Sequence, residues 1–362
     1  MDFGLSEDQV LFKDSLRRFL DAECPATRVR AVMEGPDGHD RRLWGQLAQM
    51  GVTGLMVPPE HGGAGLELLD LALAAEELGR SATPGPFLAV AMATAALLES
   101  GNAEAQKRWL SGIASGKQVV TFALGEGIGE WDAARVATRA TGGKLSGEKP
   151  VVPYAGVADA ILVAAQDTDG PALYLVERGA PGLAVSALSG LDMTRRTDRV
   201  VFVDTPATKV ASGRRAIDRA RDVGLVLLAA DAYGGSRRCL DMTVQYALTR
   251  EQFGQVIGAF QGVKHQLADL ATDLEPALSL WWYAAHAYDH IPDRSERHAA
   301  LAKALFADLY DRAIRTAIEL HGGIGFTWEF DLHLWFRRAM FDRAYLGESR
   351  YHRARAAELA GW

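Results

Sequence analysis

One connection in the C-terminal half of the chain gathers side chains that suit a phosphate group beside a flat ring. It carries the guanidinium of Arg250, the aromatic ring of Phe253, and the amides of Gln252 and Gln261. A guanidinium can form two parallel hydrogen bonds with a phosphate. An aromatic ring and amides suit a heterocycle next to it. The structural alternative is a loop between two helices in which Arg250 caps a helix end and Phe253 and Phe260 belong to the core.

Long apolar patterns flank this connection and must position it. Residues 224–248 lie upstream and residues 263–288 downstream, and the stretch from Thr249 to Gln261 contains two glycines and no proline. This pattern predicts a helix end, a tight connection and a new helix, so the two helices should be antiparallel neighbours in a bundle. An amphipathic pattern over residues 299–320 and a last helix from about His352 extend the bundle to four helices.

The rest of the chain divides into segments with helical patterns and a segment with β-strand patterns. Helical patterns fill residues 1–118, with Ser6 as an expected N-cap. Residues 211–362 are helical again. Between them, residues 119–210 hold short β-rich runs separated by Gly, Asp and Pro, which predict a small β-barrel or sandwich. The sequence therefore predicts a mainly α protein with a central β-domain, divided as 1–118, 119–210 and 211–362. The predicted strands include 119–124, 136–140, 160–165, 172–176 and 199–203.

Composition excludes several classes of protein. The 362 residues are 48% hydrophobic and 23% charged, with a net charge of -7 and both signs mixed along the chain. This argues against nucleic acid as the main partner, and no apolar run reaches the length of a membrane span. The two cysteines, Cys24 and Cys239, are far apart, so we expect no disulfide framework, no metal centre and a cytoplasmic location. The opening residues show no secretory signal. The long apolar helices predict an oligomer.

Two motifs in the helical bundle resemble the acyl-CoA dehydrogenase family. One is similar to the family's Arg-x-x-Phe-Gly turn, and a later one to its glycine-rich turn. The N-terminal part also resembles the family, in its opening and in a Pro-Glu-x-Gly-Gly-x-Gly connection. The segments are Arg250, Gln252-Phe253-Gly254, Ile257-Gly258 and Phe260-Gln261; Leu320-His321-Gly322-Gly323-Ile324-Gly325-Phe326; Leu5-Ser6-Glu7-Asp8-Gln9; and Pro59-Glu60-His61-Gly62-Gly63-Ala64-Gly65.

The resemblance implies a fold, a cofactor and partners. It implies an N-terminal helical domain, a middle β-barrel and a C-terminal four-helix bundle, with FAD, an acyl-CoA substrate and a flavoprotein as electron acceptor. In this family the two bundle motifs reach across an interface to the flavin of a neighbouring subunit. The cofactor-binding residues that the resemblance implies are Arg250, Gln252, Phe253, Gln261, Glu319, Gly322 and Gly323.

The implied reaction is α,β-dehydrogenation of an acyl thioester, which needs a base. A base removes the α-proton while the β-hydrogen leaves as hydride, and hydrogen bonds to the carbonyl stabilise the enolate-like charge. The family places a glutamate in one of two positions, which correspond here to Leu346 and Gly224. Neither residue can accept a proton.

The nearest acids are Glu348 and Asp231, and each has a structural alternative. Glu348 lies two residues beyond the expected place, where a carboxylate at a helix N-terminus is favoured by the helix dipole. Asp231 lies in an otherwise apolar helix and is either a buried base or a partner of Arg237 or Arg238. Both acids remain candidates.

The segments that would hold the flavin ring also depart from the family. The family's Thr-Glu-Pro-x-Ala-Gly-Ser run corresponds to residues 123–129, which read Ala-Leu-Gly-Glu-Gly-Ile-Gly. Its Trp-Ile-Thr/Ser strand falls near residues 151–153, which read Val-Val-Pro. Pro153 has no N–H and cannot donate to a flavin edge.

The resemblance to the family is therefore uneven. The residues that the family uses to contact adenine and pyrophosphate are present, whereas those that hold the flavin ring and supply the base are absent. Some bacterial members, including ones acting on steroid side chains, are α2β2 pairs of unlike subunits with flavin at the unlike interface. This chain resembles the subunit without the base in such a pair. The alternatives are a homomeric flavoenzyme that uses Glu348 or Asp231, and a helical scaffold protein that has lost flavin.

Overall fold

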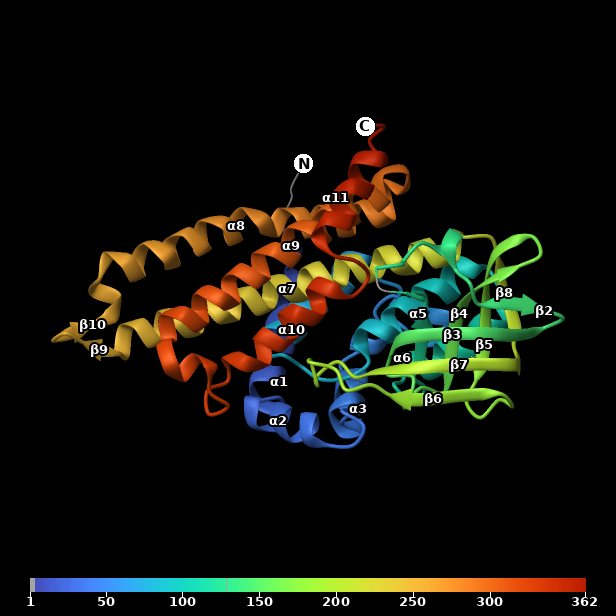
Figure 1. Cartoon of the computed structure of the whole chain (residues 1–362), viewed down its shortest axis with the longest axis horizontal. Coiled ribbons are helices and arrows are strands. Elements are labelled where there is room, and N and C mark those ends of the chain that lie inside the picture. The colour runs from blue at the N-terminus through green and yellow to red at the C-terminus, as the bar shows by residue number, and fades with distance from the viewer. Residues whose placement is uncertain (1–3, 128) are drawn as a thin grey trace.

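The computed structural model describes residues 4–127 and 129–362 (Figure 1). Residues 1–3, part of the opening without a secretory signal, and Ile128, part of the expected flavin segment, lie outside the described residues. The molecule is elongated, with the long helices α7, α8 and α9 at one end and the β-sheet at the other (Figure 1).

The N-terminal part is helical, as predicted. Ser6 starts α1 with a capping box, because its hydroxyl accepts from the N–H of Gln9 at 3.2 Å while the Gln9 amide oxygen accepts from the Ser6 N–H at 3.0 Å. The glycine-rich loop at residues 51–65 holds only short 3-10 turns. The helices are α1 (Glu7–Glu23), α2 (Ala26–Glu34), α3 (Arg41–Gln49), α4 (Leu68–Arg80), α5 (Phe87–Ser100) and α6 (Ala103–Ala114).

The middle part is one eight-stranded sheet with the order β6-β7-β3-β2-β4-β5-β8, and β1 pairs with β4. Most neighbours are antiparallel, whereas β1 and β4 are parallel. Gly142 and Gly143, both with positive φ, make the turn between β2 and β3. The strands are β1 (Val120–Ala123), β2 (Arg139–Thr141), β3 (Lys144–Pro153), β4 (Ala160–Asp167), β5 (Gly170–Glu177), β6 (Leu183–Ala187), β7 (Thr197–Pro206) and β8 (Thr208–Ser212).

The C-terminal part is the predicted bundle, with longer helices than the sequence patterns suggested. Pro276 lies inside α8, and Ile291 alone separates α8 from α9. The helices are α7 (Arg215–Thr249), α8 (Gln261–His290), α9 (Pro292–His321), α10 (Leu332–Ala344) and α11 (Ser349–Glu358).

Close helix contact joins the N-terminal part to the bundle. A Cβ on Gly79 of α4 would lie 2.2 Å from the backbone oxygen of Asp231, and one on Gly234 of α7 would lie 1.9 Å from that of Glu76. Only glycine permits this approach. One continuous hydrophobic core therefore runs from the N-terminal helices through the bundle to one side of the sheet. Within the described residues, no helix combines the length and hydropathy of a membrane span.

Candidate functional site

The connection between α7 and α8 is a small β-hairpin at the far end of the bundle (Figure 1). Its strands are β9 (Glu251–Gln252) and β10 (Gln255–Val256), and Phe253 and Gly254 form the turn with φ of 55° and 82°. Phe253 is 93% exposed although it is a large apolar residue in a left-handed conformation. The alternative that placed Phe253 in the core is wrong. An exposed, strained aromatic residue indicates a contact surface.

The polar side chains on this hairpin are available for a ligand. Arg250 ends α7 through its backbone, since its N–H donates to Tyr246 O at 2.8 Å. Its exposed guanidinium makes no ion pair or side-chain hydrogen bond with any described residue. Gln252 and Gln261 are exposed as well, and Gln252 Nε2 donates only to the adjacent carbonyl of Glu251 at 2.8 Å. A free guanidinium with amides beside it fits a phosphate.

The glycine-rich turn after α9 lies at the same end of the bundle. It is a 3-10 turn (Gly322–Phe326, η5) in which Gly322 has φ 66°, and a Cβ at Gly322 or Gly323 would meet nothing within 4 Å. His321 connects this turn to α7, because its ring stacks on Tyr246 with centroids 4.2 Å apart. Burial lowers the pKa of His321, whose Nδ1 lies 2.7 Å from Ala317 O. Glu319 is exposed one turn earlier.

The two positions that correspond to the family's glutamate lie against each other in the interior. A Cβ on Gly224 of α7 would lie 2.6 Å from Leu346 Cδ1 and 2.8 Å from Met92 Sδ of α5. Leu346 and Met92 are both 0% exposed. Leu346 also has φ 60°, a conformation that costs a branched side chain energy. The apolar side chains of Leu346 and Met92 therefore fill the space that a glutamate at either position would need.

Aromatic rings cover this interior region on the side of the sheet. Tyr345 is buried and stacks on Phe341 with centroids 5.1 Å apart. Trp131 meets Tyr345 edge-on at 5.1 Å, and its ring lies 2.5 Å from where a Cβ on Gly125 would be. The segment that the sequence assigned to the flavin ring is thus packed by Trp131.

The polar groups of the expected ring segments are also engaged within the chain. Lys149 is fully buried, and its Nζ donates to Glu126 Oε1 at 2.6 Å and to Leu124 O at 2.9 Å. Burial lowers the pKa of Lys149 to about 8. The Pro153 carbonyl accepts from Thr121 Oγ1 at 2.5 Å. These residues do not fit a flavin ring held by this chain.

The buried side chains of Lys303 and His352 hold the loop that carries Leu346 in place. Lys303 Nζ of α9 donates to Gly347 O at 2.8 Å and Arg343 O at 3.1 Å, and His352 Nε2 of α11 lies 2.9 Å from Leu346 O. Burial lowers the pKa of Lys303 to about 7 and that of His352 to about 3. The loop is therefore fixed by hydrogen bonds on one side and by packing on the other.

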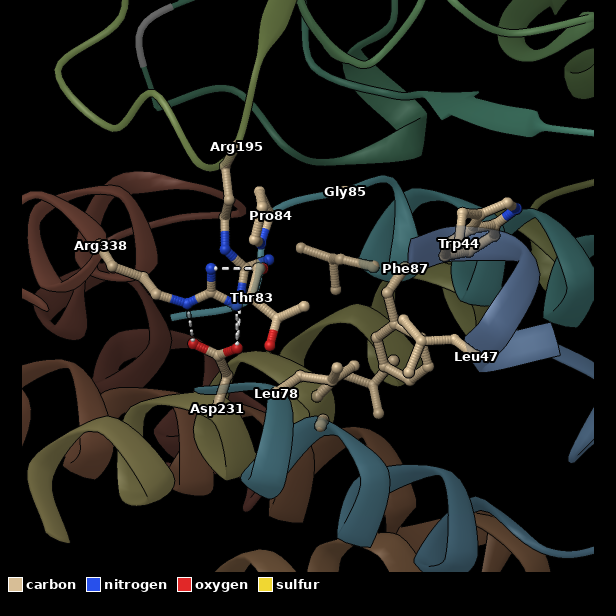
Figure 2. Close-up of a pocket in the computed structure, with 13 residues that line it drawn as sticks. Trp44, Leu47, Leu78, Thr83, Pro84, Gly85, Phe87, Arg195, Asp231 and Arg338 are labelled. Carbon is tan, nitrogen blue, oxygen red and sulfur yellow. Dashed lines mark hydrogen bonds and ion pairs between the residues drawn. The ribbon is translucent and has the colours of Figure 1, made fainter. Parts of the chain in front are cut away.

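The two acid candidates lie apart from this loop's interior face. Glu348 is exposed and is the N-cap residue of α11, as its structural alternative predicted. Asp231 is buried and accepts from Arg338 Nη2 at 2.6 Å and pairs with Arg195 Nη2 at 2.7 Å (Figure 2). Despite burial, these two guanidiniums hold the pKa of Asp231 well below its usual range. The predicted partnership with Arg237 or Arg238 is wrong, since Arg237 pairs with Glu275.

Several residues of this arrangement carried no sequence signal. Met92 and Trp131 read as core residues, and Lys303 and His352 each stand alone in a helical pattern. Their roles depend on contacts between segments far apart in the chain, such as Lys303 with Gly347. The described residues contain no group of three His, Cys, Asp or Glu side chains that could hold a metal ion.

Comparisons with known proteins agree with this architecture. Residues 6–117 match the family model described as "Acyl-CoA dehydrogenase, N-terminal domain", and residues 211–360 match "Acyl-CoA dehydrogenase, C-terminal domain". Acyl-CoA dehydrogenase IpdE2 of Mycolicibacterium smegmatis is 31% identical, over 96% of both chains. Acyl-CoA dehydrogenase FadE27 of Mycobacterium tuberculosis is 32% identical, over 96% of this chain and 95% of its own length.

Solved structures with the same fold include members of two-component complexes. The structure described as "Tcur3481-Tcur3483 steroid ACAD G363A variant" is 31% identical with a TM-score of 0.91, over 98% of both chains. The ChsE4-ChsE5 complex from Mycobacterium tuberculosis matches at 28% identity and a TM-score of 0.89, over 100% of this chain and 99% of that one. The fold, both domain models and these relatives agree, and the chain belongs to the acyl-CoA dehydrogenase family.

Proposed function

We propose that this chain is the subunit without the base in a heteromeric acyl-CoA dehydrogenase. Its partner would be a paralogous chain that supplies the catalytic glutamate, and FAD would lie at the interface of the two unlike chains. The reaction of the pair would be α,β-dehydrogenation of an acyl-CoA thioester, with a separate flavoprotein as the final electron acceptor.

The contact between Gly224 and Leu346 carries this proposal. Both positions lack a proton acceptor, and Leu346 and Met92 fill the volume between them. A general base must come within hydrogen-bond reach of the proton that it removes. Asp231 is held by Arg338 and Arg195, and Glu348 is exposed at the start of α11. On this proposal the base comes from another chain.

The outer end of the bundle supports a role for this chain in holding the cofactor. Arg250, Gln252 and Gln261 would hold the pyrophosphate and adenine end of FAD, and Phe253 would lie against the adenine and exclude water. FAD, when bound, supplies the hydride acceptor of the reaction. The open backbone at Gly322 and Gly323 allows a ligand to approach closely. These groups face away from this chain's own interior and suit a flavin whose ring is held by the partner.

The relatives favour assembly from unlike chains. Two similar structures are named for pairs of components, ChsE4-ChsE5 and Tcur3481-Tcur3483, and the second is described as a steroid acyl-CoA dehydrogenase. We infer a similar α2β2 assembly and a bulky acyl group, such as a steroid side chain, for this enzyme.

Turnover measurements on the separate and combined chains test the proposal. The chain alone should not dehydrogenate acyl-CoA, and the co-purified pair should. Replacing the partner's glutamate in the intact pair should reduce turnover by roughly 10²–10⁴-fold, the usual contribution of a general base. Full turnover by this chain alone, or loss of turnover in Glu348→Gln of this chain with flavin still bound, would overturn it.

A further inference from the structure

A buried group of charged side chains joins the β-domain to the bundle, and Figure 2 shows three of its members, Arg195, Asp231 and Arg338. Asp231 of α7 and Arg338 and Asp342 of α10 come from the bundle, while Asp192 and Arg195 come from residues 188–196, which connect β6 to β7. Their exposed fractions are 3%, 3%, 2%, 4% and 8%, respectively. The group therefore lies inside the molecule, where charge must be compensated locally.

The hydrogen bonds in this group are unevenly distributed. Asp231 accepts two bonds from Arg338, at 2.8 and 2.6 Å, and lies 2.7 Å from Arg195 Nη2. Asp192 Oδ1 accepts from the N–H and hydroxyl of Thr194, at 2.9 and 2.7 Å. Neither oxygen of Asp342 receives a bond from an N–H or hydroxyl donor of the described residues, and its carboxyl adjoins that of Asp231, to which it can donate only when it is protonated. Its nearest guanidinium atom is Arg195 Nε, at 3.5 Å.

The distribution of hydrogen-bond donors points to one retained proton. The group contains two guanidiniums and three carboxyl groups, and the ammonium of Lys303 lies nearby. Asp231 receives both guanidiniums, Asp192 Oδ1 receives the N–H and hydroxyl of Thr194 while its Oδ2 has no partner among the described residues, and Asp342 receives no donor. Burial raises the pKa of Asp192 as well. A buried carboxyl without donors is far more stable as the neutral acid.

Several charged groups act on Asp342. Asp231 of α7 disfavours its negative charge, while Arg338, Arg195 and Lys303 of α9 favour it. Desolvation is the largest influence, and together with the charge of Asp231 it raises the pKa of Asp342 well above its usual range. The nearby Lys303 has a pKa lowered to about 7, so it loses its favourable charge as the pH rises past neutrality.

We propose that Asp342 is a neutral acid beside ionised Asp231, and that its proton keeps residues 188–196 of the β-domain docked on the bundle. The bonds from Arg195 and Arg338 then converge on Asp231 alone. Ionisation of Asp342 would add an unpaired buried charge and draw Arg195 away from Asp231. Asp231 and Asp342 lie on packed helices of the bundle. We therefore expect residues 188–196, the connection that carries Arg195, to be the segment that moves.

The sign of the pH dependence follows from the position of this proton. An unfolded or undocked Asp342 has a pKa near ~3.9, below that of the docked form. The docked state therefore binds more protons, and its advantage decreases as the pH rises through the range between the two pKa values, by up to about tenfold per pH unit. Asp342 therefore favours docking most strongly below pH ~3.9, and docking should loosen progressively as the pH rises above this value.

Hydrogen exchange of residues 188–196 in the full-length protein measures this docking directly. After correction for intrinsic exchange, we expect opening of this segment to increase as the pH is raised from about 5, by up to roughly tenfold per pH unit until the pKa of docked Asp342 is passed. In Asp342→Asn, whose amide is neutral at every pH, the increase should disappear apart from any part due to Lys303. The strands β4 and β5 serve as an internal reference.

Asp231→Asn is the matched comparison, because it removes the charge that both guanidiniums need. It should open the segment at every pH, whereas Asp342→Asn should keep it closed. An infrared difference spectrum between wild type and Asp342→Asn at neutral pH should show the band of a protonated carboxyl. A pH-independent wild type, a missing band, or an Asp342→Asn variant that unfolds or opens like Asp231→Asn would overturn the proposal.

Discussion

The outer end of the bundle and its interior have opposite characters. At the hairpin, Phe253 is 93% exposed and the guanidinium of Arg250 has no partner among the described residues. In the interior, Leu346 and Met92 are completely buried, and a Cβ on Gly224 would clash with both. One region presents unsatisfied polar and aromatic groups to its surroundings, and the other has no room for a ligand.

If the two regions are parts of a shared site, as we propose, this contrast means that such parts can be kept or lost independently. Residues that would serve a cofactor bound to another chain remain exposed, while residues that would serve this chain's own cofactor ring and substrate have become core. The interior has gained packing contacts in exchange, and Lys303 and His352 hold the loop around Leu346 in place. The predictions below probe the two regions in turn.

The largest effect is expected from truncating the residue that fills the interior. Leu346→Ala should destabilise the chain by about 2–5 kcal/mol, because it leaves a cavity where the surroundings cannot collapse fully. Denaturant unfolding of the isolated chain measures this loss. Leu248→Ala is the control, since Leu248 is 59% exposed and should change stability by less than ~0.5 kcal/mol. A neutral Leu346→Ala would mean that the interior is not a packed core.

Arg250→Ala should affect the cofactor and leave the fold unchanged. Loss of a charged, two-pronged contact should weaken FAD binding to the co-purified pair by about 1.5–3 kcal/mol, or roughly 10- to 150-fold. Flavin fluorescence during dilution or competition measures this change. Arg315→Ala is the control, because Arg315 is exposed on α9 and pairs with Asp311 at 2.8 Å on the surface. Unchanged flavin affinity would make Arg250 a structural residue.

His352 should make the free energy of unfolding of the chain decrease at acidic pH. Its pKa is lowered to about 3 by burial, whereas an unfolded histidine titrates near ~6.5. The unfolded chain therefore binds a proton first, and stability present above ~6.5 is lost as the pH falls, by about 2 kcal/mol at pH 5. His352→Gln should remove this loss, and His265→Gln, at an exposed site, should keep it. Parallel pH profiles for all three proteins would contradict the assignment.

Glu348→Gln should have the smallest effect. Glu348 is exposed at the start of α11, so its replacement should change stability by less than ~1 kcal/mol and leave the turnover of the pair near wild type. Steady-state kinetics of the co-purified pair measure this. Abolished turnover with flavin still bound would place the base in this chain and erase the contrast between its two regions.

Local patterns predicted the fold well, because helix periodicity and turn residues act over short distances. The strands around residues 160–176 and the long bundle helices are confirmed. The partners of Asp231 could not be predicted in this way, since Arg338 lies 107 residues away in sequence. The filling of the interior by Met92 and Leu346 depends on three separate segments that only the folded chain brings together. The residues of the connection alone likewise did not predict the hairpin that exposes Phe253.

The flavin content of the purified protein tests the central claim most directly. The chain should be purified alone and together with its paralogous partner, and flavin per chain should be determined from the visible spectrum and from native mass. We expect a colourless chain alone and one flavin for each pair of unlike chains in the complex. A yellow, active chain alone, or one flavin on every chain of the complex, would contradict the claim that this chain's own ring site is filled.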